Sequence, residues 1–262
     1  MQYDPVKDRV SELIRLFPLA RSIFYAVLDR VLLRQRYVKG MIAKYAPGSA
    51  RFGFYDAGAG FCQYSAYVMK RWSGARVFAT DLKADYLSDF AYVASKDYPG
   101  RFSYCQADLQ DHIPQNKYDM AVAIDILEHI EDDVAAIRNI HACLNPGGHL
   151  IISTPSDTDE AAKFTEEHVR PGYAKADLEE KLAKAGFEII ESIYSYGIWG
   201  ALAWRLLIKH PLSLLKHGKL TLVLLAPYLM LCFPICELLM QMDIRRTNKS
   251  GTGIVIVARK ES

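Results

Sequence analysis

Between Arg51 and Ser153, short apolar runs alternate with stretches of helical spacing, and no other feature of the chain limits its fold as strongly. Each run is short enough to form a buried strand, and each intervening stretch can carry a crossover helix. This alternation predicts a parallel sheet with helices on both faces. The five runs are Phe52 to Tyr55, Arg76 to Thr80, Phe102 to Gln106, Met120 to Ile124 and His149 to Ser153.

Further elements flank this core. Two more apolar runs, Phe187 to Tyr194 and Gly253 to Ala258, bring the expected strands to seven in a mixed sheet, and a helix is expected over Lys175 to Ala185. Pro146-Gly147-Gly148 predicts a turn before the fifth strand. An apolar stripe over residues 5–45, interrupted at Pro18, predicts two helices. The expected parts are an N-terminal helical lid (1–47), a core (48–196), a helical insertion (197–250) and the last strand (251–262).

The composition is that of a folded protein of 262 residues, with 51% apolar and 24% charged residues. The five cysteines form no CxxC pair, so neither a disulfide framework nor a zinc site is expected, and a reducing compartment follows. A net charge of +2 is too small for a dedicated nucleic-acid binder. Charged residues crowd the first twelve positions in place of a signal peptide, so we expect a cytoplasmic protein.

A glycine-rich turn follows the first strand, in the order Asp56-Ala57-Gly58-Ala59-Gly60, and leads into a helix near Gln63. Glycines let the backbone approach a ligand closely, and a helix N-terminus favours anionic groups. A tight turn with no ligand is the alternative interpretation, and the turn alone does not separate the two.

Three more acids stand where the next strands end. Asp81 closes the second strand and can accept both ribose hydroxyls of a nucleoside ligand. Asp108 follows the third strand, and Asp125 closes the fourth. Singly, each acid is typical of a helix cap or a solvated loop. Together with Asp56 they mark the carboxyl rim of a parallel sheet, where open sheets bind ligands.

On these motifs the sequence resembles the class I S-adenosylmethionine-dependent methyltransferases. The matching segments are Asp56-x-Gly58-x-Gly60, Asp81, Asp108-Leu109, the block from Asp125 to Ile130, and Asn145-Pro146-Gly147-Gly148. The resemblance implies a Rossmann-like fold and S-adenosylmethionine as cofactor. It implies that Gly58 and Gly60 pack against the methionine moiety, that Asp81 binds the ribose, and that Asp108 and Leu109 frame the adenine.

The resemblance also places Asp56, Leu82 and Asp125 among the cofactor-binding residues. One departure from the family is Cys62, which stands where a third glycine is usual and is expected to tighten the pocket without abolishing binding. A dinucleotide is disfavoured, because its motif requires Gly or Ala at position 63, where this chain has Gln63.

A base is needed if the methyl acceptor is a neutral hydroxyl or a protonated amine. His168 is the first choice, in the loop after the fifth strand, with Tyr173 or Arg170 orienting the acceptor; a solvated surface loop is the alternative. His129 is the second choice, and a role in the helix framework is its alternative. Neither an Asn-Pro-Pro-Tyr motif nor a Pro-Cys pair is present, which disfavours a nucleic-acid substrate. The acceptor atom is not readable from the sequence.

The insertion carries a net charge of +5 and a run of 17 uncharged residues, Leu220 to Cys236. A single membrane crossing is excluded if the strand at 254–258 rejoins the sheet. The preceding segment, Ile198 to Ile208, is too short for a second span. Residues 198–250 are therefore expected to contact a membrane surface, wall an apolar pocket, or pack against the sheet or another subunit. The basic and aromatic residues that fit an interfacial segment are Trp199, Trp204, Arg205, Lys209, Lys216 and Lys219.

Together these features predict a methyltransferase of a lipophilic small molecule or lipid precursor, acting at the cytoplasmic membrane surface. One alternative is a soluble phenol or carboxylic acid as acceptor, with the insertion serving only as a lid. Another is a non-catalytic S-adenosylmethionine-binding protein, which the four rim acids disfavour. No metal site is expected, and the oligomeric state is not readable.

Overall fold

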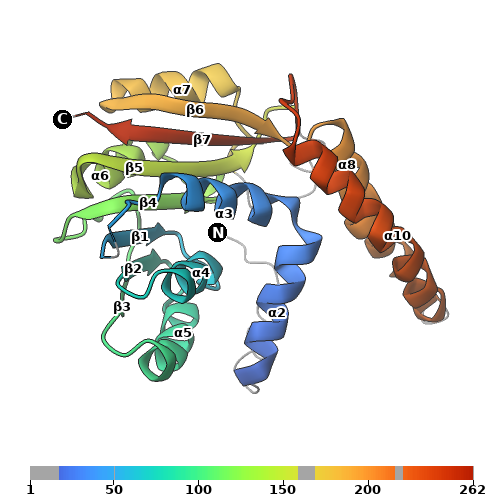
Figure 1. Ribbon diagram of the computed structural model, residues 1–262. Coiled ribbons are helices and arrows are strands. Elements are labelled where there is room, and N and C mark those ends of the chain that lie inside the picture. Colours follow the sequence, from blue (N-terminus) through green and yellow to red (C-terminus); the bar gives the residue numbers. More distant parts are fainter. Residues whose placement is uncertain (1–17, 50, 159–168, 216–220, 262) are drawn as a thin grey trace.

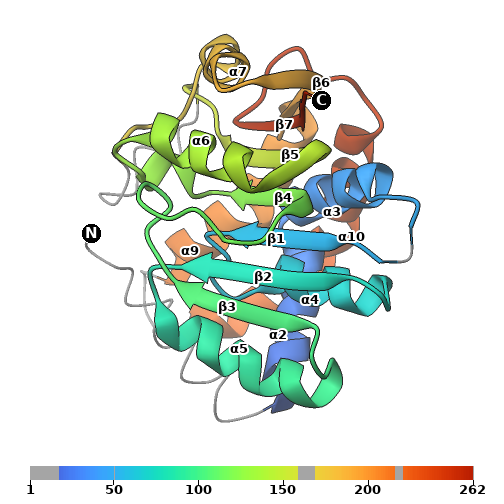
Figure 2. The same cartoon turned by 90° about the vertical axis from the view of Figure 1, so that its left-hand side faces the viewer.

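The computed structural model describes residues 18–49, 51–158, 169–215 and 221–261. Its centre is a seven-stranded sheet in the order β3-β2-β1-β4-β5-β7-β6, stacked from bottom to top in Figure 2. β7 is antiparallel to both of its neighbours, whereas the other pairs are parallel. The predicted mixed sheet is confirmed. The strands are β1 (Gly53–Ala57), β2 (Arg76–Asp81), β3 (Phe102–Gln106), β4 (Tyr118–Ile124), β5 (Leu144–Pro155), β6 (Phe187–Ser195) and β7 (Gly253–Lys260).

The predicted turn at Pro146-Gly147-Gly148 is wrong in one respect, because it lies within β5 and does not precede it. The pairing of β4 with β5 passes from Tyr118 with Leu144 to Met120 with His149. The extra residues of β5 form a bulge, where glycine and proline are tolerated. The strand thus resumes its ladder at His149, the residue at which the sequence predicts its start.

Helices cover the two faces of the sheet unequally. α3 (Leu33–Tyr45), α4 (Gln63–Arg71) and α5 (Ala84–Asp97) pack on one face, and α6 (Asp133–Cys143) and α7 (Lys175–Lys184) on the other. On the second face, no described helix lies over β1 to β3, and Figure 2 shows these strands uncovered. Three stacked rings protect this area, since Tyr55, Phe78 and Tyr118 have centroids 5.5 to 5.8 Å apart.

The N-terminal helices contain a break that the sequence does not predict, and the residues before Pro18 lie outside the described residues. Pro18, where the sequence predicts the interruption, is the first described residue of α2 (Pro18–Val31). Within the described residues the break lies at Leu32, which has extended backbone angles of φ −98° and ψ 108°. α2 therefore turns away from α3, whose Leu33, Val38 and Ile42 are buried in the core.

The insertion forms a two-legged helical arm that projects from the body (Figure 1). The outgoing leg consists of α8 (Ile198–Trp204), a π-helical segment η3 (Arg205–Lys209) and α9 (His210–Leu215). The returning leg is α10 (Thr221–Ile244), which contains Pro227 and Pro234 and contacts α8, η3 and α9. The outgoing leg thus extends beyond Ile208, the end expected from the sequence.

Buried polar contacts fix the root of the arm. The Asp243 side chain is fully buried on α10, and its Oδ2 accepts a 2.9 Å hydrogen bond from the Tyr37 hydroxyl on α3. Its Oδ1 accepts a 3.0 Å bond from the backbone N–H of Gly200 on α8. The Arg36 guanidinium of α3 donates to both carboxylate oxygens of Glu237 at 2.7 and 2.6 Å. The arm, α3 and the sheet therefore share one continuous core.

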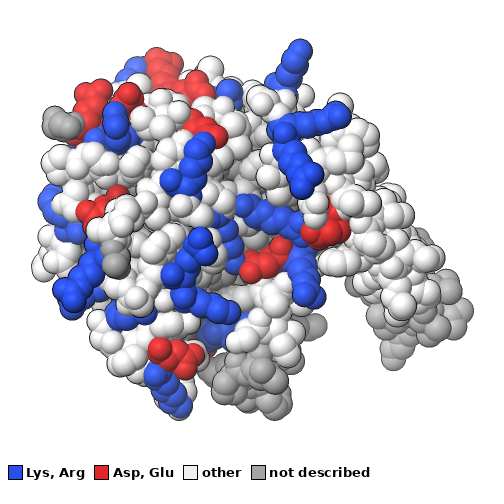
Figure 3. Space-filling model, viewed as in Figure 1, with Lys and Arg blue, Asp and Glu red and all other residues white. Residues whose placement is uncertain are grey.

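Away from its root, α10 is largely exposed. Met230 is 79% and Leu231 73% exposed, and Ile235 and Leu238 continue the same apolar stripe at helical spacing. Figure 3 shows an arm with few charged residues. The segment Leu225–Ile244 meets the length and composition of a membrane-spanning helix, with a mean hydropathy of 1.5 and 17% of it buried. A helix of this kind alone is weak evidence for a membrane, since core helices share the property.

Candidate functional site

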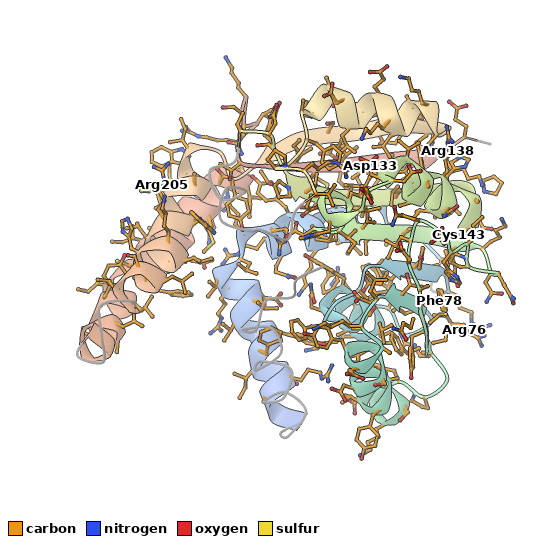
Figure 4. All side chains as sticks on the ribbon, turned by 180° about the vertical axis from the view of Figure 1, so that it is seen from behind. Arg76, Phe78, Asp133, Arg138, Cys143 and Arg205 are labelled. Carbon is orange, nitrogen blue, oxygen red and sulfur yellow. The ribbon has the colours of Figure 1, made fainter. Side chains whose placement is uncertain are left out.

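A cavity of about 590 Å³ opens at the carboxyl rim of the sheet. The strand ends form its floor, α2 and the start of α3 form one wall, and Ala201, Trp204 and Arg205 of the arm form another. Figure 4 shows Arg205 on the arm. The site predicted at this rim is therefore enclosed by the N-terminal helices and the insertion together.

The glycine turn after β1 has the geometry of a ligand cradle. The N–H groups of Gly58 and Ala59 both donate to the carbonyl of Thr80, at 2.8 and 2.9 Å. Gly58 has φ +74°, and a Cβ there would come within 2.6 Å of the Ile126 side chain. Gly60 has φ +50° with nothing within 4 Å of the place of a Cβ, which leaves room for a ligand beside the backbone.

The departure from the family at Cys62 does not narrow the cavity as expected. Cys62 is fully buried, belongs to the core and is absent from the cavity wall. It caps α4 in the left-handed conformation, with φ +58°. Glycine adopts this conformation without strain, which gives a physical reason for a glycine at this position in the family.

Asp81, Leu82, Asp108 and Leu109 all line the cavity, as predicted. Asp81 Oδ2 accepts a 2.8 Å hydrogen bond from the Gly60 N–H, and Oδ1 accepts a 2.9 Å bond from the Lys83 N–H. Asp108 Oδ1 accepts a 3.0 Å bond from the Gln110 N–H. These bonds orient the two carboxylates, and the remaining acceptor capacity of each suits ribose hydroxyls and an adenine amino group.

The predicted contact of Asp56 with the cofactor is not what the structure shows. The Asp56 carboxylate is buried beneath the glycine turn and does not line the cavity. Its Oδ2 accepts from the Ser65 hydroxyl at 2.6 Å and from the Ser65 N–H at 3.1 Å. Burial raises the pKa of Asp56 to about 6, although the bonds from Ser65 oppose this shift. Asp56 thus supports α4 and the turn from below.

Asp125 lines the cavity at the end of β4, with a left-handed φ of +49°. Its Oδ2 accepts from Nη1 of Arg34, at the start of α3. The backbone N–H of Arg34 also donates to the Tyr196 hydroxyl at 3.1 Å. This ion pair joins the N-terminal wall of the cavity to the sheet. A contact of Asp125 with the cofactor stays a prediction.

Of the residues predicted for catalysis, His129 lines the cavity, in a 3₁₀ turn η1 (Leu127–His129) that ends before α6. His168 lies outside the described residues. Arg170 and Tyr173 are absent from the cavity wall, so the structure does not place them toward an acceptor.

Arg170 and Tyr173 instead brace the turn that carries His129. The Arg170 guanidinium donates to the carbonyls of Leu127 and Ile130, both at 2.7 Å. The buried Tyr173 hydroxyl lies 2.6 Å from Oδ2 of Asp133, at the start of α6 (Figure 4), and donates to that carboxylate. The sequence analysis singles out this segment but predicts the wrong role for Arg170 and Tyr173. Their partners are backbone carbonyls and the carboxylate of Asp133, which no sequence motif reveals.

Glu128 is a second potential base beside the cavity. It is fully buried, and its Oε2 accepts a 3.1 Å hydrogen bond from the Thr154 hydroxyl. Burial raises the pKa of Glu128, the largest of the influences on it. Its carboxyl group is therefore more basic than an exposed one and better matched to general-base catalysis near neutral pH.

The strand order divides the cavity into two halves. Asp108 after β3, Asp81 after β2 and the glycine turn after β1 follow one another along the rim. The cavity then continues over the ends of β4, β5 and β7, where Asp125 and Gly253 lie. The resemblance predicts the adenine, ribose and methionine of the cofactor along the first three strands, so we expect the methyl acceptor over the others. We call this second part the acceptor half.

Several cavity residues have no signal in the sequence. Phe61 and Tyr86 stack at 4.6 Å beside the glycine turn. Arg34 and Gln35 belong to the start of α3, where a helical pattern predicts only a packed helix. Trp204 and Arg205 line the cavity and Trp199 packs on the core, so these three do not form the interfacial face predicted for them.

Sequence comparisons agree with this geometry. The profile of a family described as a methyltransferase domain matches residues 57–192. The ubiquinone biosynthesis O-methyltransferase of Vibrio parahaemolyticus serotype O3:K6 is 31% identical over 83 residues, 31% of this chain and 35% of that one. The trans-aconitate 2-methyltransferase of Azoarcus sp. is 30% identical over 105 residues, 40% of each chain. The chain thus spans about a third to two fifths of the length of these curated relatives.

Solved structures show the same fold. The N-methyltransferase NodS of Bradyrhizobium japonicum, in complex with S-adenosyl-L-homocysteine, aligns with a TM-score of 0.55 and 15% identity over 90% of this chain and 91% of that one. Phosphoethanolamine N-methyltransferase 2 of Haemonchus contortus, in complex with S-adenosyl-L-methionine, aligns with a TM-score of 0.60 and 16% identity over 85% and 52%.

Replacing Asp81 with Ala is expected to weaken binding of S-adenosylmethionine by one to two decades, or about 1.5 to 3 kcal/mol, because charge-assisted bonds to the ribose are lost. The Gly60 N–H also loses its acceptor. Titration calorimetry measures the change. The control is Asp85→Ala, an exposed acid on α5 outside the cavity wall. Equal affinities for the two variants would contradict the role of Asp81.

Replacing Asp56 with Asn is expected to flatten the pH dependence of stability. The folded pKa of about 6 exceeds the ordinary value of 3.8 for an exposed aspartate, so protonation stabilises the fold below the lower value and this stability is lost as the pH rises through 6. From pH 5 to 7.5 the wild type should lose about 1.4 kcal/mol relative to Asp56→Asn, at 1.36 kcal/mol per pKa unit. Urea denaturation across this range measures the difference; parallel curves would refute the assignment.

Proposed function

Because the chain belongs to the S-adenosylmethionine-dependent methyltransferases, we propose that it methylates a lipophilic small molecule or lipid precursor at the cytoplasmic surface of a membrane. The observation that carries this proposal is the position of the arm. One side of the arm walls the acceptor half of the cavity, and its other side exposes an apolar stripe.

S-adenosylmethionine supplies a methyl group on a sulfonium; the acceptor atom forms a bond to the methyl carbon as the carbon–sulfur bond breaks, and that electron pair stays on sulfur. Alignment of the two partners contributes roughly 7 to 11 kcal/mol in favourable cases. The glycine turn, Asp81 and Asp108 fix the donor side, and the walls of the acceptor half fix the other. Few residues of this chain therefore need to take part in proton transfer.

A hydroxyl acceptor must lose its proton as it attacks. His129 and Glu128 lie at the acceptor half, on the turn that Arg170 and Tyr173 brace. A braced turn holds a base at a fixed place, which general-base catalysis requires. An oxygen acceptor is supported by the name of the Vibrio relatives, ubiquinone biosynthesis O-methyltransferase.

The walls of the acceptor half favour an acceptor with an apolar body. Leu28 and Leu32 line the cavity from the N-terminal helices, and Trp204 lines it from the arm, whereas Phe24 packs edge-on against Phe61 beside the glycine turn. Burial of apolar surface contributes about 25 cal/mol per Å² to binding. A soluble carboxylic acid, with the arm serving only as a lid, is the second candidate, and the trans-aconitate 2-methyltransferase supports it.

The exposed side of the arm suits a membrane surface. The stripe of Met230, Leu231, Ile235 and Leu238 has no cover among the described residues. At the root of the arm, Arg245, Arg246 and Lys249 are exposed. Apolar side chains flanked by basic residues fit the boundary between acyl chains and anionic headgroups, where each basic residue adds about 1 kcal/mol. The outgoing leg leaves the sheet after β6 and the returning leg leads back to it before β7, as a segment lying on one side of a membrane requires.

Replacing His129 with Ala is expected to lower kcat by roughly 100-fold while the affinity for S-adenosylmethionine changes only a few-fold. Release of S-adenosylhomocysteine with a panel of alkylated catechols measures turnover. His149→Ala is the control, since this residue lies on β5 beside Tyr45, away from the cavity. If His129→Ala turns over normally, Glu128→Gln and His168→Ala become the decisive variants.

The protein is expected to bind anionic vesicles and to release them as salt rises. Replacing both Met230 and Leu231 with Ser should weaken this binding about tenfold or more, because their apolar side chains no longer enter the membrane. Ile113→Ser is the control, an exposed apolar residue on the body of the protein. Replacing Arg245, Arg246 and Lys249 with Gln should also weaken binding. If vesicle flotation recovers no wild-type protein at low salt, the proposed membrane binding is wrong.

A further inference from the structure

The acceptor half carries a polar corner in an otherwise apolar wall. Leu28, Leu32 and Trp204 line this half together with two polar side chains at the start of α3, Arg34 and Gln35. Packing of α3 against the core does not require either polar group, because its buried apolar residues supply those contacts. These two polar side chains are therefore expected to bind a polar group that is not part of the core.

Arg34 uses only part of its hydrogen-bonding capacity. Its Nη1 donates to Asp125 and its guanidinium lies beside the buried Tyr64 hydroxyl, whereas its buried Nε–H makes no well-aligned hydrogen bond among the described residues. The side chain keeps 28% of its surface exposed. A guanidinium group has five donors in a flat fork, so a bond to Asp125 leaves donors for a second acceptor.

Gln35 is left with unmade bonds. Its side chain is 1% exposed, and neither Oε1 nor Nε2 has a hydrogen-bond partner among the described residues. A buried polar group without a partner costs about 1 to 3 kcal/mol, so such groups are rare unless a ligand or water completes them. An orphaned amide at the wall of a ligand cavity is a second sign, independent of Arg34, that a polar ligand group belongs there.

The electrostatics of this half favour an anion. Arg34 and Arg205 bring two positive charges to its wall. Asp125 is engaged with Arg34, and Oε2 of the buried Glu128 accepts a hydrogen bond from the Thr154 hydroxyl. The other polar residues that line the cavity at this half are His129, Ser153, Thr154, Ser195, Tyr196 and Thr252.

We infer that the methyl acceptor carries a carboxylate, which binds to the guanidinium of Arg34 with the amide of Gln35 beside it. A planar carboxylate matches the fork of arginine, and a bond between ionised partners is about twice as strong as a neutral one. The acceptor would then be an amphiphile, with its apolar body against Leu28, Leu32 and Trp204. This inference rests on the proposed methyltransferase function and names the class of its substrate.

The competing explanation is structural: Arg34 then serves only to join α3 to Asp125, and no ligand binds to it. The two explanations differ in what the protein discriminates. A carboxylate subsite distinguishes an acid from its uncharged ester, whereas a purely structural ion pair does not. The matched control is Arg36, two residues along α3, whose guanidinium pairs with Glu237 on the arm and does not line the cavity.

The test compares 3,4-dihydroxycinnamate with its methyl ester, because only the first carries a carboxylate. Calorimetry on protein loaded with S-adenosylhomocysteine measures both affinities. The wild type and Arg36→Met are expected to bind the acid at least tenfold more tightly than the ester. Arg34→Met should lose this preference, and Gln35→Glu should reverse it through repulsion between carboxylates. Affinity for S-adenosylhomocysteine and thermal unfolding establish that each variant is folded.

Equal affinity of the wild type for acid and ester would overturn the inference, as would an acid preference that survives in Arg34→Met or in Gln35→Glu. If Arg34→Met does not fold, Gln35→Glu alone decides. Methyl transfer is measured separately through release of S-adenosylhomocysteine. Selective binding of the acid without turnover would count against the proposed function but not against the carboxylate subsite. Turnover of both probes at equal rates would support the proposed function and count against the carboxylate subsite.

Discussion

The return of the last strand, β7, to a place between β5 and β6 determines where the other functional parts lie. β7 enters between β5 and β6, antiparallel to both, and its first residue, Gly253, pairs with Ser195 at the end of β6. Whatever is inserted between these strands must leave and rejoin the sheet at the carboxyl rim. This is also the rim where β1 gives way to the glycine turn. The arm therefore rises beside the ligand cavity by topology and contributes to its wall.

A buried polar junction makes the arm part of the same body as the cavity. Asp243 collects hydrogen bonds from α3 and α8, and the Arg36–Glu237 pair adds a second link between α3 and α10. α3 also carries Arg34, which reaches Asp125 at the end of β4. A surface bound to the exposed stripe of α10 would thus be one helix away from the acceptor half. Removing one partner from such a buried network leaves polar groups unsatisfied, which stabilises the assembled form over any partly opened one.

The acids of the rim resemble one another in the sequence but differ in physical role. Asp81 and Asp108 face the cavity with oriented carboxylates, whereas Asp56 lies below the turn and holds the N-terminus of α4. Asp125 is engaged with an arginine from a distant helix. Burial separates these roles. The buried Asp56 has a raised pKa and no access to a ligand, so its carboxyl group supports the turn and does not bind the cofactor.

The sequence by itself determined the seven strands, their mixed sheet and the cofactor half of the site, because hydrophobic periodicity and turn chemistry are local signals. Gly58, Gly60, Asp81 and Asp108 follow directly from strand ends. The acceptor half was decided only by the tertiary structure. Arg34 and Gln35 line it from α3, for which the sequence pattern predicts only a packed helix. Arg170 and Tyr173 are predicted to face the acceptor, but in the structure they brace a turn. Arg34, Arg170 and Tyr173 depend on partners 40 or more residues away, so no local pattern could encode their roles.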